Sequence, residues 1–391
     1  MANSSIPPRI PAHSAPPRCV RIPAAIRRQT LACTLAPAAL ALAAAAQSTP
    51  EPAWAAEVDR IFAPWDRPDS PGCALGVIQD GKLVHARGFG QASLEHGVPI
   101  TTQTVFDIGS TSKQFTAAAL GLLVQEEKVR VDDEIHLWIP ELHDLGDIVI
   151  LDHLLHHTSG LPDYLGLLIR EGHKEADWTT PEDALEALKK VEKLRFEPDS
   201  RFEYSNTNFF LLSLVVQRAT KKSLAVFARE RFFEPLGMQS TLILDDHTLV
   251  VPHRATGYSS REAGGFGVEM SDFEQLGDGA VQTTVEDLAR WDASFYSRRV
   301  GGDALQAFLH ETGVLNDERP IEYARGLFVD EFHGLARVSH GGAWAGYRAQ
   351  LMRFPEQKTS IVCLANLASM DPNALCERVA LLVLADRIGT K

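Results

Sequence analysis

The sequence predicts a mixed α/β fold of the α+β type, in which an antiparallel sheet flanked by helices stands beside an all-helical lobe. Short apolar runs typical of strands occur near both ends of the chain. The middle of the chain instead carries apolar residues at helical spacing. Strands from both ends can share one sheet when the helices between them form a separate layer. With 391 residues, of which 45% are hydrophobic, the chain can bury the core of one large two-lobed domain or of two domains.

The first elements expected after the N-terminal segment are a helix at 54–62 and a β-hairpin. The apolar runs at 73–78 and 83–89 are separated by Gln79-Asp80-Gly81-Lys82. An Asp-Gly pair between two apolar runs is a strong signal for a tight turn. These two runs therefore predict neighbouring antiparallel strands.

A helix is predicted to begin at Ser110, after the apolar run 105–109. The residues that recur at helical spacing behind it are Phe115, Ala118, Ala119, Leu122 and Leu123. The later elements expected are, in order, helices at 181–191 and 209–219, a Gly- and Asp-rich loop at 264–279, strands at 323–330, 336–339, 349–354 and 360–364, and a closing helix at 372–388.

These elements predict one domain over 58–391, preceded by a linker at 47–57. Its sheet lobe would comprise about 58–109 and 320–391, and its helical lobe about 110–319. Ligand sites commonly lie in clefts between such parts. We therefore expect the functional site between the lobes.

Residues 1–46 differ in kind from the rest of the chain. They hold five Arg, no Lys and no acidic residue, and Arg27 and Arg28 precede an apolar stretch that ends in Ala44-Ala45-Ala46. This order predicts a secretory signal peptide with a long basic, Pro-rich lead-in, and so a periplasmic or secreted protein. The alternatives are a disordered tail, a start codon assigned too far upstream, or an uncleaved membrane anchor, although the apolar run is short for a membrane span.

The net charge argues against two classes of partner. The whole chain has a formal charge of −13, and without the five Arg of 1–46 it has 33 basic and 51 acidic residues, a charge of −18. An acidic surface disfavours nucleic acids and anionic membranes. We expect a small-molecule or peptide substrate, no nucleic acid and no stable membrane partner.

The cysteines give no sign of a metal site or a redox pair, because no C-x-x-C occurs. Two of the five belong to residues 1–46. Cys73 and Cys363 lie in apolar strand-like runs, where buried free thiols are expected. Cys73, Cys363 and Cys376 together allow one disulfide in an oxidising compartment.

The strongest chemical signal is Ser110-Thr111-Ser112-Lys113. Residues i and i+3 share a helix face, so the Lys113 amine would lie near the Ser110 hydroxyl. A serine becomes a good nucleophile when a neighbouring base takes its proton, and a desolvated lysine can be that base. Free backbone N–H groups in the first helical turn can also face an oxyanion. Taken alone, the pattern would more often be an N-cap serine with a solvated lysine.

Two later triplets change that balance. Tyr204-Ser205-Asn206 and His340-Gly341-Gly342 complete the series S-x-x-K, Y-x-N, H-x-G, and each pattern occurs once in the chain. Three single occurrences in a fixed order favour a catalytic site over coincidence.

The trio resembles the active site of the penicillin-recognising serine hydrolases. It is most similar to the branch that holds class C β-lactamases, D-stereospecific peptidases such as D-aminopeptidases, and β-lactamase-like carboxylesterases. The flanking segments that share this resemblance lie at 152–162, 235–238, 254–258, 284–291 and 353–355, so that it extends from about Val58 to the C-terminus. The resemblance implies the β-lactamase/transpeptidase-like fold.

The resemblance also implies a role for each motif residue. Ser110 would be the acylated nucleophile and Lys113 its base partner. Tyr204 would shuttle the proton to the leaving group, and Asn206 would orient Lys113 and the substrate carbonyl. The backbone N–H groups of Ser110 and Ala343 would form the oxyanion hole.

The third motif departs from the K-T-G of the β-lactamases. His340 would bind substrate where they carry Lys, and Gly341 and Gly342 would let the strand approach the substrate. An imidazole carries less positive charge than Lys at neutral pH. The departure disfavours efficient β-lactam hydrolysis and resembles D-aminopeptidases and some esterases.

Rival readings of other residues are weaker. His153, His156 and His157 share helical spacing but lack the Glu of a zinc motif, so packing and capping are favoured and no metal is expected. The elbow G-x-S-x-G does not occur, and Glu203 alone does not make a glycosidase pair.

Four residues near the motifs are left open. Asp163 and Tyr164 either line the cleft or belong to an ordinary loop. Trp344 and Tyr347 either wall an acyl pocket or only pack beside the strand.

Taken together, the sequence predicts a secreted, cofactor-free serine hydrolase that cleaves an ester or amide through an acyl-enzyme on Ser110. An esterase or a D-amino-acid-directed peptidase is favoured. The alternatives are a class C-type β-lactamase and a non-catalytic penicillin-binding sensor. The presence of both Lys113 and Tyr204 favours turnover, because deacylation needs a base that activates water.

Overall fold

The computed structural model describes residues 51–174 and 177–388. These belong to one compact unit that begins at Thr49. The predicted signal peptide, 1–46, lies outside the described residues. Within them, no helix has both the length and the apolar character needed to cross a bilayer.

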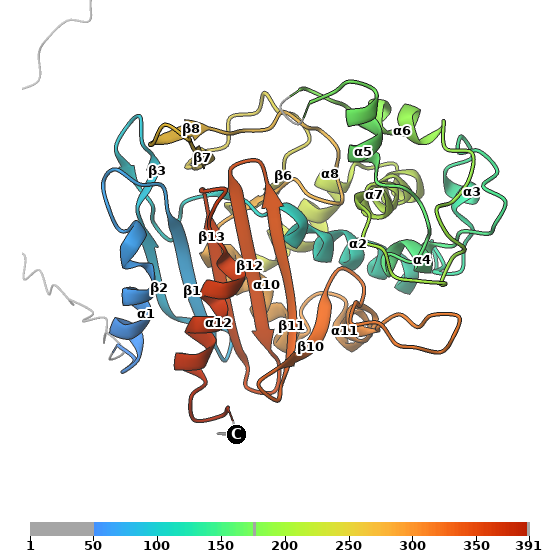
Figure 1. The fold of residues 1–391 in the computed structure, drawn as a ribbon. Coiled ribbons are helices and arrows are strands. Elements are labelled where there is room, and N and C mark those ends of the chain that lie inside the picture. The colour runs from blue at the N-terminus through green and yellow to red at the C-terminus, as the bar shows by residue number, and fades with distance from the viewer. Residues whose placement is uncertain (1–50, 175–176, 389–391) are drawn as a thin grey trace, which may run out of the picture. The chain divides into compact units, whose positions relative to one another are not determined.

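An antiparallel sheet dominates one side of this unit (Figure 1). In the described residues its six strands follow the order β10-β11-β12-β13-β1-β2. Their bounds are β1 Cys73–Gln79, β2 Lys82–Phe89, β10 Phe328–Phe332, β11 Leu335–Trp344, β12 Tyr347–Phe354 and β13 Thr359–Ala365. β1 pairs with β13 from Cys73 opposite Ala365 to Gln79 opposite Thr359. The two ends of the chain therefore share one sheet, which confirms the predicted fold class.

The hairpin between β1 and β2 turns where the sequence predicts it. Asp80 and Gly81 both have positive φ, of 48° and 74°. Two central residues of positive φ are what a type I′ turn requires, and its twist matches that of the strands.

Helices cover both faces of the sheet. α1 (Ala55–Phe62) and α12 (Pro372–Val383) lie on one face, where Val58, Leu75 and Val379 share a buried core. α10 (Val285–Ser297) lies against the opposite face, where Ala74 and Leu288 belong to the larger core. β1 is buried on both sides, which explains its nearly continuous apolar sequence.

The helices of the second lobe surround α2 (Lys113–Gln125). All residues of α2 from Lys113 to Leu123 are buried, and the polar side chains of Lys113, Gln114 and Thr116 are hydrogen-bonded there. The other helices of this part are α3 Ile135–Trp138, α4 Leu151–Leu155, α5 Tyr164–Arg170, α6 Pro181–Leu188, α7 Asn206–Thr220, α8 Leu224–Ala228, α9 Glu234–Leu236 and α11 Gly302–His310. Shorter turns are η1 Ala63–Trp65, η2 Gly109–Ser112 and η3 Arg229–Phe233, the last of them π-helical.

The boundary between the lobes differs from the expected one. α10 falls within the segment predicted as helical lobe but packs on the sheet. Helical periodicity identifies a buried face without identifying its partner. The same segment also holds the short strands β6 Leu242–Ile243, β7 Tyr258–Ser260, β8 Phe266–Val268 and β9 Val281–Thr283, and β9 pairs with both β6 and β5. The remaining strands are β3 Gln91–Ser93, β4 Val98–Pro99 and β5 Phe106–Asp107.

Several element ends differ by a few residues from the expected ones, for example at α1, β10 and α12. α1 begins at Ala55, inside the expected linker, because Ala55 and Val58 are buried in the core. β10 begins at Phe328 rather than 323, because the chain bends at 325–327, where Gly326 has φ +80°, and Tyr323 forms only an isolated bridge to Phe328. α12 ends at Val383 rather than 388.

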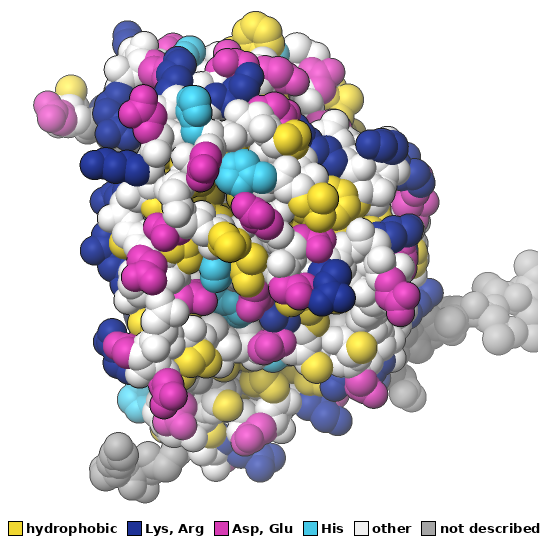
Figure 2. Space-filling view, turned by 90° about the vertical axis from the view of Figure 1, so that its right-hand side faces the viewer, with side chains coloured by type: hydrophobic (Ala, Val, Ile, Leu, Met, Phe, Trp, Pro, Cys, Tyr) yellow, Lys and Arg dark blue, Asp and Glu magenta, His cyan; other side chains and the backbone are white. Residues whose placement is uncertain are grey.

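The molecular face drawn in Figure 2 carries both signs of charge. Lys and Arg side chains alternate with Asp and Glu, and hydrophobic side chains form small groups between them. The excess of acidic residues in the sequence is therefore mixed with basic ones on this face.

Candidate active site

Ser110 lies in a tight turn in front of the buried helix α2. At the end of β5, Oδ1 of Asp107 accepts a hydrogen bond from the backbone N–H of Gly109 at 2.7 Å. Gly109 has φ +48°, in the left-handed region that favours glycine. The turn continues through η2 into α2, which begins at Lys113. The predicted helix start is confirmed, with the difference that its first turn is a 3₁₀-helix.

The turn packs against the strand that carries the third motif. Thr111 Oγ1 donates a hydrogen bond to the carbonyl oxygen of His340 at 3.2 Å. A Cβ on Gly342 would lie 1.9 Å from the carbonyl oxygen of Ile108, so that only glycine permits this approach. As a result Ser110 and Ala343, the two predicted oxyanion-hole residues, line one cleft.

Lys113 is fully buried and bonded to three acceptors. Its Nζ donates to Ser110 Oγ at 3.0 Å, to Asn206 Oδ1 at 2.9 Å and to the carbonyl oxygen of Asp278 at 2.8 Å. The amide and carbonyl oxygens can only accept, so they retain two N–H groups when the amine is neutral. The lone pair of the neutral amine is then directed at the Ser110 hydroxyl. Burial lowers the pKa of Lys113 to about 8, although the charges of Asp278 and Asp163 oppose this shift.

The rate of acylation should therefore rise with pH and level off above about 8. Lysine accepts a proton only when neutral, which requires a pH above its pKa of about 8. With an uncharged substrate, kcat/KM at pH 7 should be roughly tenfold below the plateau. A pH profile of kcat/KM between pH 6 and 10 measures this. A profile that is flat, or that falls above pH 7, would contradict the assignment of Lys113 as base.

Asn206 is oriented by Asp163. Oδ2 of Asp163 accepts hydrogen bonds from the backbone N–H of Asn206 at 2.8 Å and from its Nδ2 at 3.0 Å. The amide nitrogen of Asn206 is thus held at Asp163, and its oxygen is left for Lys113. Oδ1 of Asp163 also caps α5 through the N–H of Leu165. Asp163, which the sequence left open, joins the starts of two helices at the site.

Tyr204 lies two residues before the start of α7, and its ring faces the Lys113 amine. Lys113 Nζ lies 5.0 Å from the centre of the Tyr204 ring. The Tyr204 hydroxyl oxygen is buried and has no hydrogen-bond partner among the described residues. Burial raises the pKa of the Tyr204 phenol. The nearby Ser110 hydroxyl lowers this pKa in part, although no hydrogen bond of ordinary geometry joins the two groups. A neutral phenol beside Ser110 is suited to donate a proton.

His157 fixes the segment that contains Tyr204. Its Nδ1 accepts from the backbone N–H of Ser205 at 3.3 Å, and its ring packs on that of Tyr204 with centres 4.2 Å apart. Because Nδ1 accepts, Nε2 carries the proton and donates to the hydroxyl of Tyr323 at 3.2 Å. Burial lowers the pKa of His157 well below its usual value, so the ring is neutral.

His340 continues this chain of bonds. The Tyr323 hydroxyl donates to His340 Nε2 at 3.2 Å, and His340 Nδ1 donates to the carbonyl oxygen of Gly341 at 2.6 Å. Burial, followed by the charge of Lys113, lowers the pKa of His340 to about 3. The ring is uncharged and both nitrogens are engaged. We therefore propose that His340 positions the third motif, in place of the substrate contact predicted from the sequence.

The other histidines of 152–157 have separate protein partners. Nε2 of His153 lies 3.2 Å from Asp199 Oδ2, and Nδ1 of His153 accepts from the N–H of Ile150. His156 Nε2 lies 3.0 Å from the carbonyl oxygen of Glu311. These contacts serve helix packing and capping, the role that the sequence favours for these histidines.

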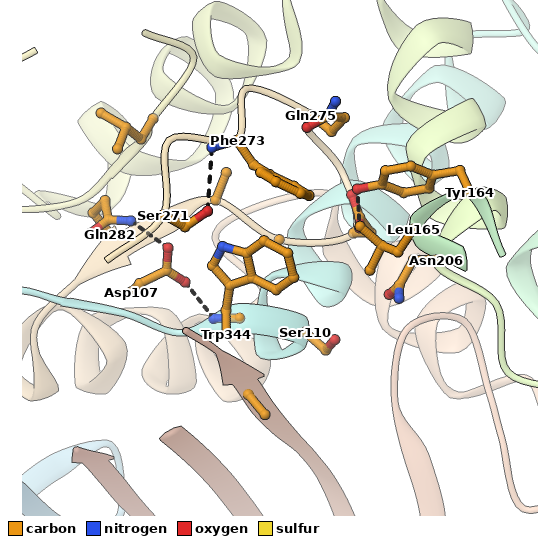
Figure 3. Close-up of a pocket in the computed structure, with 16 residues that line it drawn as sticks. Asp107, Ser110, Tyr164, Leu165, Asn206, Ser271, Phe273, Gln275, Gln282 and Trp344 are labelled. Carbon is orange, nitrogen blue, oxygen red and sulfur yellow. Dashed lines mark hydrogen bonds between the residues drawn. The ribbon is translucent and has the colours of Figure 1, made fainter. Parts of the chain in front are cut away.

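A cleft opens beside Ser110. In Figure 3, Trp344 lies between two groups of side chains, Asp107 and Gln282 on one side and Tyr164 and Leu165 on the other. Ser110 lies below the indole ring of Trp344 in this view. Phe273 lies against Trp344, with ring centres 4.9 Å apart. Trp344 thus belongs to the cleft wall, whereas Tyr347 is buried and its hydroxyl donates to the carbonyl oxygen of Ala255.

Residues 58–385 match the model of the Beta-lactamase family. The chain belongs to the beta-lactamase family. The predicted resemblance to the penicillin-recognising serine hydrolases is thereby confirmed.

Two curated relatives of this beta-lactamase-family chain are similar over most of its length. A D-aminopeptidase of Gluconobacter oxydans is 28% identical over 296 residues, which are 76% of this chain but 56% of that protein. Penicillin-binding protein 4* of Bacillus subtilis is 30% identical over 309 residues, 74% of this chain and 67% of that protein. The chain thus spans little more than half the length of the D-aminopeptidase it matches.

A solved structure extends the comparison. The octameric penicillin-binding protein homologue from Pyrococcus abyssi superposes with a TM-score of 0.74 at 25% identity, over 84% of this chain and 76% of that one. This superposition supports the fold assignment.

Several cleft residues of this beta-lactamase-family chain lie outside the three sequence motifs. The loop from Ser271 to Ala280 supplies Phe273, Gln275 and Asp278 to the lining, and β9 supplies Gln282. The sequence predicts 264–279 only as a Gly- and Asp-rich loop, whereas in the structure Phe266–Val268 form β8. The position of this loop beside Ser110 depends on hydrogen bonds to α2, such as that from Thr116 Oγ1 to the carbonyl oxygen of Gly277 at 2.7 Å.

Proposed function

We propose that the chain is a serine hydrolase that cleaves an ester or a D-aminoacyl amide through an acyl-enzyme on Ser110. The observation that carries this proposal is the 3.0 Å contact between Lys113 Nζ and Ser110 Oγ, in which the two other partners of the amine are fixed acceptors. That arrangement supplies a nucleophile and its base in one turn of helix.

The acylation step follows from this geometry. Lys113 takes the proton of Ser110, and Ser110 Oγ attacks the substrate carbonyl carbon. The resulting oxyanion accepts hydrogen bonds from the backbone N–H groups of Ser110 and Ala343. The phenol of Tyr204 gives its proton to the leaving oxygen or nitrogen and recovers one through Lys113. Water then attacks the acyl-enzyme, with the same groups acting in reverse.

The choice of substrate class rests on two observations. One relative is a D-aminopeptidase. The cleft beside Ser110 is lined by apolar, polar and acidic side chains, and the described lining residues include no Lys or Arg. A neutral or cationic acyl group is compatible with such a lining, whereas a carboxylate is not.

A second candidate function is the hydrolysis or binding of a β-lactam. The relative from Bacillus subtilis is a penicillin-binding protein. Ser110 also borders a second, open hollow that is lined by Arg348, whose guanidinium could meet a carboxylate. We place this function second because Arg348 already donates to the carbonyl oxygens of Ala345 and Tyr347.

Wild-type protein should hydrolyse p-nitrophenyl butyrate or D-alanine p-nitroanilide with a higher kcat/KM than nitrocefin. The neutral His340 offers no cation to the carboxylate of a β-lactam. The comparison uses the three chromogenic substrates at pH 8, and EDTA should leave each rate unchanged. A preference for nitrocefin would make β-lactam hydrolysis the favoured function. A rate that is lost with EDTA and restored by zinc would overturn both candidate functions.

A further inference from the structure

Asp278 is a buried carboxyl group at the wall of the cleft. It is 8% exposed and lies on the loop that packs against α2. Its backbone carbonyl oxygen accepts from Lys113 Nζ at 2.8 Å, and its Oδ2 accepts from the hydroxyl of Tyr164 at 3.0 Å. Its Oδ1 has no hydrogen-bond partner among the described residues. A buried carboxylate oxygen without a donor is costly, which indicates that a donor arrives with the ligand.

The charges of the cleft lining favour a cation. Asp107 and Asp278 are the carboxyl groups of the described lining, which includes no Lys or Arg. Both oxygens of Asp107 are engaged, one by the N–H of Gly109 and the other by Nε2 of Gln282 at 2.7 Å. The oxygen of Gln282 is a further acceptor without a partner among the described residues. Figure 3 shows Gln282 across the cleft from Tyr164, the residue whose hydroxyl donates to Oδ2 of Asp278.

Asp278 lies close to the reacting atoms. Its carbonyl oxygen and Ser110 Oγ are bonded to the same amine, that of Lys113. In an aminoacyl substrate, a single carbon separates the α-amino nitrogen from the carbonyl carbon that Ser110 attacks. A group that recognises an α-amino nitrogen must therefore lie within a residue's length of the nucleophile, as Asp278 does.

We propose that Asp278 binds the α-ammonium group of an aminoacyl substrate, so that the acyl part carries a free primary amine. This inference rests on the proposed acyl-enzyme at Ser110. The ammonium would donate to Oδ1 of Asp278, while Tyr164 holds the other oxygen and so fixes the plane of the carboxylate. Burial raises the pKa of Asp278 to about 6, with the charge of Lys113 opposing the shift, and the carboxyl group is still mostly ionised at pH 7.

The competing role for Asp278 is to tune Lys113. Its negative charge raises the pKa of that amine. Loss of the charge would then affect every substrate equally and would move the pH profile of acylation. Recognition of an ammonium affects only substrates that carry one, and it acts mainly on KM.

The test compares D-alanine p-nitroanilide with N-acetyl-D-alanine p-nitroanilide at pH 7, where a free α-amino group is mostly protonated. The two have the same leaving group and stereochemistry and differ in the positive charge. Wild type should prefer the free amine, and Asp278→Asn should lower kcat/KM for the free amine by about 10- to 100-fold, the effect of one charge-assisted hydrogen bond. The same variant should change kcat/KM for the acetylated substrate less than about threefold. Asp272→Asn removes a carboxylate from an exposed position on the same loop and should change neither rate.

The results distinguish a failure of the role proposed for Asp278 from a failure of the proposed hydrolase function. Equal losses for both substrates, or no loss for the free amine, would overturn the role of Asp278 while leaving the proposed hydrolase intact. A wild type that prefers the acetylated substrate would also overturn it, even where Asp278→Asn does not fold. A wild type in which neither substrate nor any ester is cleaved in a Ser110-dependent way would remove the proposed function, and this inference with it.

Discussion

Ser110→Ala should lower kcat/KM for every ester or amide substrate by at least about 10³-fold, because the covalent route through the acyl-enzyme is lost. The cleft, Lys113 and the backbone N–H groups remain, so substrate should still bind with a KM near that of wild type. Ser110 is half-buried and its hydroxyl oxygen accepts one hydrogen bond, from Lys113. The free energy of unfolding should therefore change by no more than about 1 kcal/mol. Steady-state kinetics and thermal unfolding measure the two quantities.

A control variant separates loss of the nucleophile from loss of any hydroxyl in the cleft. Ser271 also lines the cleft, and its Oγ accepts from the N–H of Phe273. Ser271→Ala should keep kcat/KM within a few-fold of wild type. A folded Ser110→Ala protein with rates like those of Ser271→Ala would rule out Ser110 as nucleophile.

Lys113→Met and Tyr204→Phe should each lower kcat by about 10²- to 10⁴-fold, the usual effect of losing a general base or acid. In the proposed mechanism both groups handle the same proton, which leaves Ser110 and reaches the leaving group. Their effects should therefore not multiply, and the double variant should be little slower than the slower single variant. Lys113→Met keeps the length of the side chain but leaves the oxygens of Asn206 and Asp278 without the amine. Tyr204→Phe removes a hydroxyl that has no partner among the described residues, so it should unfold at the wild-type temperature.

A double-variant cycle with p-nitrophenyl butyrate provides the measurement. Burst kinetics separate acylation from deacylation in each variant. If the losses in activation free energy of the single variants add up in the double variant, the two residues act independently and the shared proton path is wrong.

The fold could be predicted because its signals are local in the sequence. The Asp80-Gly81 turn and the apolar runs on either side of it define a hairpin without reference to the rest of the chain. The i, i+3 spacing of Ser110 and Lys113 likewise places hydroxyl and amine together on one turn, as the 3.0 Å contact between them shows. In motifs of this kind, the spacing in the sequence determines which side chains are neighbours.

The remaining site residues could not be predicted because they meet through tertiary packing. Asp278 follows Lys113 by 165 residues, and their contact depends on a loop held against α2. His157 reaches Tyr323 across 166 residues. Neither pair forms a pattern in the sequence.

His340 shows how burial alters chemistry that a motif alone suggests. The resemblance to β-lactamases places it where they carry Lys, and an exposed imidazole would be partly charged near pH 6.5. In the structure the ring is 3% exposed and bonded at both nitrogens, and its pKa falls to about 3. The motif identifies the position, and the surroundings of the ring determine its charge.

The most direct measurement of the central claim is the site of acylation. Wild-type protein is incubated with a slowly released acylating agent such as a fluorophosphonate, and intact-mass and peptide mass spectrometry locate the adduct. We predict one adduct per chain, on the peptide that contains Ser110, which is absent from Ser110→Ala and forms more slowly in Lys113→Met. An adduct on any other residue, or one that forms equally fast in folded Ser110→Ala protein, would contradict the account.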